Sequence, residues 1–211
     1  MKFVFRPSGT AFGFCWLPAA AITLGSQLPV LDTTRLQLRP YRAADAALFF
    51  EVLDQSRARL RLSFPDRLRA VPTLADAPAQ LAAFAHDWRT GRFYVFGIWH
   101  RTSQAYLGDI CLMPQRGGQA EIGYYLAAEA EGHGYAREAL GAIVQFGFEQ
   151  VQAERLLIRC FADNERAQRV AQAHQFQLLP QEEPARPWFR FNLWGDTPPQ
   201  TPDILHFMRS R

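Results

Sequence analysis

The sequence predicts a mixed α/β fold, with a central and mostly antiparallel sheet of about six to seven strands flanked by helices. Two observations carry this prediction. The apolar patterns follow one another as strand, helix, helix, three strands, helix, strand, helix and closing strands. The three central strands are joined by tight turns, which favours antiparallel pairing over an all-parallel, doubly wound sheet.

The first elements are a short strand and a helix. Residues 34–40 alternate polar and apolar side chains and stop at a proline, which predicts a strand. Residues 43–54 are expected to form a helix. Its predicted core-facing positions are Ala47, Leu53 and either Phe50 or Leu48.

A loop and a second helix follow. Residues 57–69 are rich in arginine and contain a proline, so we expect mainly loop. Thr73 with Asp76 three residues later is typical of a helix start, and Gly91 is a natural helix end. The apolar residues at helical spacing are Leu81, Phe84, Ala85 and Trp88.

Three strands and another helix make up the middle of the chain. Strands are predicted over residues 93–100, 106–113 and 121–126, as an antiparallel meander. A strongly amphipathic helix is then predicted over residues 135–150. Its apolar face consists of Ala136, Leu140, Ile143, Val144 and Gly147.

The remaining elements are short. A strand is predicted over residues 155–161 and a helix over residues 165–174. Closing strands are predicted over residues 176–179 and 204–208, separated by a proline-rich stretch. No repeat or linker divides the chain, so residues 26–211 form one predicted domain.

Residues 1–25 are interpreted as an N-terminal extension or the product of a misassigned start codon. The segment resembles a weak signal peptide, but Pro18 interrupts it and it is too short to span a membrane. The cysteines, Cys15, Cys111 and Cys160, are odd in number and match no metal or disulfide spacing. We therefore expect reduced thiols, a cytoplasmic location and no bound metal. A net charge of +3 does not indicate nucleic-acid binding.

A glycine-rich turn joins the third central strand to the long helix. It reads Glu131-Gly132-His133-Gly134-Tyr135-Ala136. The first N–H groups of a helix lack internal partners and carry partial positive charge, so this position suits a phosphate. A tight strand-to-helix turn without a ligand explains the glycines equally well. The Walker motif is absent, and the Rossmann pattern fits poorly.

Several motifs in order resemble the GNAT superfamily of acetyltransferases, and within it the RimJ/RimL-like branch, which acetylates protein N-terminal amines. The motifs are residues 34–40, Tyr106-Leu-Gly-Asp-Ile-Cys-Leu112, Glu121-Ile-Gly-Tyr-Tyr-Leu126, the turn with its helix to Leu140, and Asp163-Asn164-Glu-Arg-Ala-Gln-Arg169-Val170. The resemblance implies acetyl-CoA as co-substrate and an amine acceptor, either a peptide N-terminus or a small molecule. A homodimer would also be compatible with it.

The resemblance also implies which residues bind the cofactor. Backbone amides of the turn would hold the pyrophosphate, from Glu131, Gly132, His133, Gly134, Tyr135 and Ala136. The backbone of Tyr124, Tyr125 and Leu126 would pair with the pantetheine arm, and Asn164 would make a polar contact. Three positions depart from the family pattern: Glu131 replaces Gln or Arg, Ala167 replaces a hydroxyl residue, and Gln175 replaces a glycine.

Acetyl transfer needs a neutral amine and a polarised thioester carbonyl. A backbone amide of residues 124–126 could polarise the carbonyl. An α-amine, with a pKa of about 8, needs only a weak base. Glu121 is the first candidate base, with a solvated strand end as the alternative; Asp109 and Tyr125 are further candidates.

The arginines of residues 57–69 could attract an acidic acceptor, although a solvated face is the simpler interpretation. The leading hypothesis is an N-acetyltransferase that uses direct transfer. The alternatives are a CoA-binding or regulatory module with impaired catalysis, motivated by Glu131 and Ala167, and a binding domain without CoA.

Overall fold

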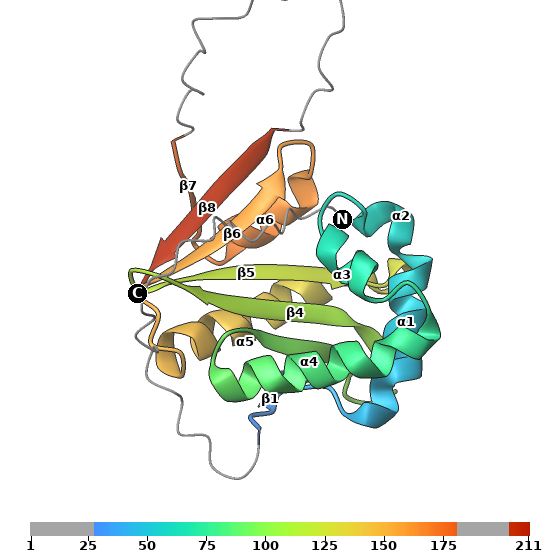
Figure 1. The fold of residues 1–211 in the computed structure, drawn as a ribbon. Coiled ribbons are helices and arrows are strands. Elements are labelled where there is room, and N and C mark those ends of the chain that lie inside the picture. The colour runs from blue at the N-terminus through green and yellow to red at the C-terminus, as the bar shows by residue number, and fades with distance from the viewer. Residues whose placement is uncertain (1–27, 181–202) are drawn as a thin grey trace, which may run out of the picture.

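The computed structural model describes residues 28–180 and 203–211 (Figure 1). These residues form one eight-stranded sheet in the order β1-β2-β3-β4-β5-β6-β8-β7. Every neighbouring pair is antiparallel except β5 and β6, which are parallel. The mixed α/β fold with a mostly antiparallel sheet is therefore confirmed. The predicted extension at residues 1–25 and most of the proline-rich stretch lie outside the described residues.

The strands have the following bounds: β1 Leu31–Asp32, β2 Leu36–Arg39, β3 Tyr94–His100, β4 Tyr106–Gln115, β5 Gln119–Leu126, β6 Arg155–Phe161, β7 Gln177–Leu178 and β8 Ile204–Ser210. The predicted meander is confirmed as β3, β4 and β5. The two-residue β1 was missed, because Leu31 and Asp32 are too short a run to show a period.

The helices are α1 Ala46–Gln55, α2 Arg57–Leu60, α3 Pro65–Ala70, α4 Ala77–Thr90, α5 Tyr135–Glu149 and α6 Glu165–Ala173. Short 3₁₀ turns are η1 Ala43–Asp45, η2 Leu74–Asp76 and η3 Ala128–Ala130. Helix α4 crosses one face of the sheet and α5 lies behind the other (Figure 1). The main core lies between the sheet and these two layers.

Two sequence-based predictions about the N-terminal helices were wrong. Residues 57–69 contain helices α2 and α3, because Pro65 occupies the first turn of α3, where proline is tolerated. In α1, Ala47 and Leu48 face solvent and Phe50 is half-buried, whereas Phe49, Val52 and Leu53 are buried. The buried stripe of α1 is Ala46, Phe49, Val52 and Leu53, so only Leu53 among the predicted core positions is confirmed.

Helix signals elsewhere behave as predicted. Thr73 and Asp76 form a reciprocal capping box, and Gly91 closes α4 in a left-handed conformation. In α4, Trp88 is buried and donates its indole N–H to the Val95 carbonyl at 2.9 Å. The predicted apolar face of α5 is buried at every position. Among the described residues, no helix is both long and apolar enough to cross a bilayer.

Strands β5 and β6 separate partway along their length. Parallel pairing joins residues 119–122 of β5 to residues 155–158 of β6, and no further pairs follow among the described residues. Strand β5 continues to Leu126 alongside β4, while β6 continues to Phe161 alongside β8. The two strands are therefore splayed beyond Ile122 and Ile158, on the side that leads to the glycine-rich turn.

Candidate functional site

The glycine-rich turn opens into a surface cavity at the N-terminus of α5. Gly132 and Gly134 have φ angles of 82° and 80°, a region that glycine adopts without the steric cost of a Cβ. The cavity has a volume of about 290 Å³. Its lining includes five of the six turn residues together with Leu126 at the end of β5. The cavity therefore connects the helix N-terminus with the splayed strands.

Three arginines that the sequence analysis did not single out also line this cavity. They are Arg137 from α5 and Arg166 and Arg169 from α6. Positions 166 and 169 share one face of a helix because they are three residues apart. That spacing was available in the sequence, but only the fold places α6 beside the start of α5. Three guanidinium groups and a helix N-terminus form a strong site for anions.

Glu131 does not present an unscreened negative charge to the cavity. Its Oε1 accepts a very short hydrogen bond from Arg59 Nη1. Its Oε2 accepts a hydrogen bond from Arg166 Nη1 at 3.1 Å. The apparent mismatch between Glu131 and an anion site is therefore largely neutralised by neighbouring arginines.

His133 and Tyr135 face a second hollow. The His133 ring stacks on the Tyr135 ring with centroids 5.6 Å apart, and the Arg35 guanidinium lies over the Tyr135 ring, 4.7 Å from its centroid. His133 lines a hollow together with His100 and Glu129, and is not among the residues that line the arginine-rich cavity. Its side chain therefore points away from the predicted phosphate position, while its backbone remains part of the turn.

Asn164 occupies the N-cap of α6. Its Oδ1 accepts a hydrogen bond from the Ala167 backbone N–H at 3.2 Å. This contact gives Asn164 a structural role in starting the helix that carries Arg166 and Arg169. The predicted contact of Asn164 with a cofactor stays a prediction.

Tyr124 and Tyr125 point to opposite faces of β5, as strand geometry requires. Tyr125 lies opposite Asp109 of β4 and packs edge-on against Phe64, with ring centroids 5.6 Å apart. Tyr124 lies opposite Ile110, on the other face. Both rings are 1% exposed. Tyr125 therefore belongs to the face that α1 to α4 cover, together with Asp109 and Glu121.

Asp109 forms a buried ion pair with Arg67 of α3. Arg67 Nη1 donates to Asp109 Oδ1 at 2.5 Å, and the Tyr41 hydroxyl donates to Oδ2 at 3.1 Å. Asp109 is fully buried and Arg67 is 8% exposed. Burial disfavours the charge of Arg67, but the neighbouring Asp109 more than offsets this and raises the pKa of Arg67 above its ordinary value. This geometry fixes α3 onto the sheet.

Glu121 is buried at the point where β5 meets β6, so the alternative of a solvated strand end is wrong. It is 3% exposed. Its carboxylate accepts hydrogen bonds from Arg159 Nε at 2.7 Å and Gln115 Nε2 at 2.9 Å. Burial raises the pKa of Glu121 above its ordinary value, although Arg159 opposes the shift. A raised pKa makes the carboxylate a better proton acceptor.

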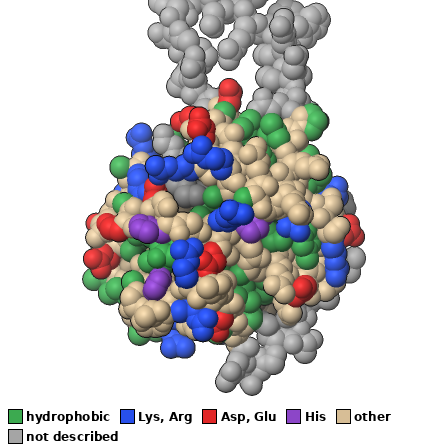
Figure 2. All heavy atoms as spheres, turned by 180° about the vertical axis from the view of Figure 1, so that it is seen from behind, with side chains coloured by type: hydrophobic (Ala, Val, Ile, Leu, Met, Phe, Trp, Pro, Cys, Tyr) green, Lys and Arg blue, Asp and Glu red, His purple; other side chains and the backbone are tan. Residues whose placement is uncertain are grey.

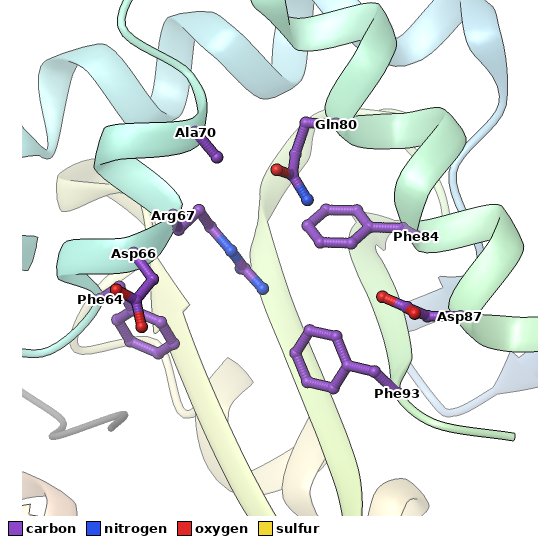
Figure 3. A pocket seen from close by; sticks show the side chains of 8 residues that line it. All are labelled: Phe64, Asp66, Arg67, Ala70, Gln80, Phe84, Asp87 and Phe93. Carbon is purple, nitrogen blue, oxygen red and sulfur yellow. The ribbon is translucent and has the colours of Figure 1, made fainter. Parts of the chain in front are cut away.

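A further cavity opens on the same face of the sheet, between α3 and α4 (Figure 3). It has a volume of about 240 Å³. Aromatic side chains of Phe64, Phe84 and Phe93 line it, together with the carboxylates of Asp66 and Asp87. Because the Phe64 ring also touches the Tyr125 ring, the cavity adjoins the residues that surround the end of β5.

The arginines of residues 57–69 are mostly engaged within the protein. Arg57 pairs with Asp54 and donates to the Val71 carbonyl, and Arg69 pairs with Asp66. Arg59 and Arg67 have the partners described above. The interpretation of these arginines as a solvated face is wrong for Arg67, which is buried. Arg57, Arg59, Arg67 and Arg69 are each paired with a carboxylate, so these four do not form an open cluster of positive charge.

The buried cysteines do not look like nucleophiles. Burial raises the pKa of Cys111 to about 12 and that of Cys160 to about 11, so both remain thiols near neutral pH. Within the described residues, no group of three or more His, Cys, Asp or Glu side chains could hold a metal ion.

Comparison with known proteins identifies the family. Residues 35–177 match the Acetyltransferase (GNAT) domain family, and the chain therefore belongs to the GNAT acetyltransferases. A curated relative, the uncharacterized N-acetyltransferase YoaA of Bacillus subtilis, is 27% identical over 71% of this chain and 83% of its own. The predicted superfamily and the class of enzyme are thus confirmed.

Solved structures support the fold. RimL, a ribosomal L7/L12 α-N-protein acetyltransferase solved with coenzyme A, is 19% identical with a TM-score of 0.70. The match covers 86% of this chain and 98% of RimL. Mycobacterium smegmatis RimJ, solved with CoA-disulfide, is also 19% identical, with a TM-score of 0.64 over 87% of this chain and 86% of RimJ.

Proposed function

We propose that this protein transfers the acetyl group of acetyl-CoA to a primary amine. The observation that carries the proposal is the continuity between the splayed end of β5 and the arginine-lined cavity at the start of α5. A cofactor with a diphosphate at one end and an extended arm at the other suits this arrangement. The helix N-terminus would bind the diphosphate, and the edge of the strand would pair with the extended arm.

The residues have distinct proposed roles in binding the co-substrate. Backbone amides of the turn bind the pyrophosphate, with Arg137, Arg166 and Arg169 adding charge. The backbone of Tyr124, Tyr125 and Leu126, where β5 diverges from β6, pairs with the pantetheine arm, which places a backbone N–H near the thioester carbonyl. Asn164 acts by starting α6 and so positioning its arginines.

Glu121 is the proposed general base. Its carboxylate lies on the same sheet face as Tyr125, beside the splay, and burial raises its pKa toward the range that suits a base. The α-amine of a protein has a pKa of about 8, so a weak or water-relayed base suffices. Asp109 is less suited to accept a proton, because Arg67 and Tyr41 already donate hydrogen bonds to its carboxylate. Its proposed role is to hold these side chains in place. Tyr125 would contact the acyl end.

The proposed acceptor is the N-terminal α-amine of a peptide or protein, as for RimL, an α-N-protein acetyltransferase whose fold this chain shares. The cavity between α3 and α4 is a suitable place for an acceptor side chain (Figure 3). A small-molecule amine remains the competing acceptor class.

Calorimetric titration with acetyl-CoA tests this proposal. The wild type should bind, and Gly134→Asp should abolish binding, because it adds a carboxylate at a φ of 80° in the phosphate position. Thiol release with a panel of peptides and amines then measures transfer. No binding at about millimolar acetyl-CoA, equivalent to roughly −4 kcal/mol, would refute the proposal.

Ala167 motivates a second candidate function, a CoA-binding module with impaired catalysis. Its methyl group is fully buried at the start of α6 and offers no proton to a departing thiolate. Under this alternative, acetyl-CoA would bind but no acceptor of the panel would release free thiol. Ala167→Ser would then be the variant in which activity appears.

A further inference from the structure

Glu131 joins the two helical layers of the protein at the end of β5. Arg59, on one side, belongs to α2, which continues into α3 above Tyr125 and Asp109. Arg166, on the other side, belongs to α6, which packs against α5 and β6. In Figure 1, α2 and α3 lie at one side of the C-terminal end of β5, and α6 lies behind β6. A single carboxylate therefore connects the two sides of the splay.

Arg59 is the more firmly held of the two arginines. Besides Glu131, its guanidinium donates to the Ser56 hydroxyl at 3.0 Å and to the Leu126 carbonyl at 3.1 Å. Ser56 is buried at the start of α2, and its carbonyl accepts the backbone N–H groups of Arg59 and Leu60. Arg59 thus ties the start of α2 to the last residue of the strand that borders the splay.

Arg166 is held less firmly and faces the cavity. Its side chain is 69% exposed, compared with 30% for Arg59, and its hydrogen bond to Glu131 is 3.1 Å long. It lines the same cavity as Gly132 and Gly134. A phosphate in that cavity offers a more highly charged acceptor than a carboxylate, so Arg166 can exchange one partner for the other.

We propose that Glu131 is a positioning residue of the acyl-transfer site, which fixes Arg59 against the cofactor strand and releases Arg166 to the cofactor's phosphates. The proposal rests on the proposed function for its second half only. Glu131, the unusual acid in the turn, links the phosphate turn to the helices that border the acceptor side. Loss of Glu131 should therefore affect the acceptor side as well as the cofactor side.

The test compares Glu131→Gln, Arg59→Gln and Arg166→Gln with the matched control Glu129→Gln. Glu129 is an exposed acid in η3, two residues before Glu131, so its replacement makes the same change of charge in the same segment. The measurements are amide hydrogen exchange of the ligand-free protein, the Kd of coenzyme A, and the KM and kcat for the most active peptide acceptor.

Hydrogen exchange tests the tie to α2 without any ligand. In Glu131→Gln and Arg59→Gln, the amides of Arg59 and Leu60 should exchange about tenfold faster, as expected for losing a charge-assisted hydrogen bond worth roughly 1.4 kcal/mol. They should be unchanged in Arg166→Gln and Glu129→Gln. Unchanged exchange in Glu131→Gln overturns the proposal, whatever the protein does with coenzyme A.

Ligand measurements test the second half. Arg166→Gln should raise the Kd of coenzyme A several-fold and leave the acceptor KM unchanged. Arg59→Gln should raise the acceptor KM several-fold and leave the Kd of coenzyme A unchanged. Glu131→Gln should lower the Kd and raise the acceptor KM, with kcat little changed. A lower Kd without a change in acceptor KM or exchange would show that Glu131 is only an adverse charge. No coenzyme A binding by the wild type would defeat the proposed function, while the exchange result still decides the tie.

Discussion

Buried charged side chains in this protein lie beside matched partners. Asp109 has Arg67 and the Tyr41 hydroxyl, Glu121 has Arg159 and Gln115, and Glu131 has Arg59 and Arg166. Each partner comes from a different segment than the carboxylate it contacts, and the nearest along the chain is Gln115, at the end of β4. Removing one member of such a set leaves the other charged in a poorly solvated place.

Asp109→Ala is expected to lower the free energy of unfolding by about 3–5 kcal/mol, because it leaves the buried Arg67 guanidinium without its counter-charge. Urea denaturation measures the change. The double variant Asp109→Ala/Arg67→Met should recover part of the loss, since neither charge remains. A single variant as stable as the wild type would mean that the pair contributes nothing.

Glu121→Gln is expected to lower kcat/KM by about two to three orders of magnitude, which is the usual loss when a general base is removed. The Kd of coenzyme A should be unchanged, because Glu121 is not among the residues that line the phosphate cavity. Glu149→Gln, on the exposed end of α5, is the matched control. Full activity in Glu121→Gln would assign the base elsewhere.

At the scale of elements, contacts between segments remote in sequence fix the start of α5. Glu138, in the first turn of α5, accepts hydrogen bonds from the Thr33 hydroxyl at 2.6 Å and from the Arg35 backbone N–H at 2.7 Å. Arg35 also donates to the His133 carbonyl at 3.0 Å. The chain between β1 and β2 thereby supports the turn that opens the cavity.

The stability of this contact should depend on pH. Partial burial opposes the charge of Glu138, but the hydrogen bonds from Thr33 and Arg35 prevail and hold its pKa below its ordinary value of 4.5. Its stabilisation is therefore complete above pH 4.5 and is lost as the pH falls through the folded-state pKa.

Urea denaturation of the wild type and Glu138→Gln over this range measures the effect. The difference in unfolding free energy between them should shrink on acidification by on the order of 1 kcal/mol, a modest value because Arg35 is exposed and screened. A difference that stays constant with pH would contradict the assignment to Glu138.

At the scale of the whole molecule, the last strand closes the sheet over β6. Strand β8 pairs with β6 along its full length, and Phe207 in β8 is 1% exposed. This pairing holds β6 on the β8 side while β5 stays with β4, so the splay between β5 and β6 depends on residues at the end of the chain.

Phe207→Ala is expected to cost about 3–5 kcal/mol of unfolding free energy, because it leaves a cavity beneath the sheet. Ser210→Ala, at the exposed end of the same strand, is the control and should change stability little. Thermal and urea denaturation report both. A tolerant Phe207→Ala would show that β8 contributes little to the core.

The sequence by itself determined most of the elements and the location of the turn. Period-two and helical apolar spacing predicted β6 and the buried face of α5. Local signals predicted a helical start at Thr73, which caps the 3₁₀ turn η2 that leads into α4, and the end of α4 at Gly91. These features depend on residues within a few positions of one another, which is why they can be read along the chain.

Only the tertiary structure decided what each charge does. The sequence marked Glu131 as a mismatched acid, Glu121 as either a candidate base or a solvated strand end, and the arginines of residues 57–69 as one group. The partners that decide the role of Glu131, Arg166 and Arg59, lie 35 and 72 residues away from it. Since the energy of a charge depends on distance and burial in space, it was the packing of α2, α3 and α6 around β5 that assigned these roles.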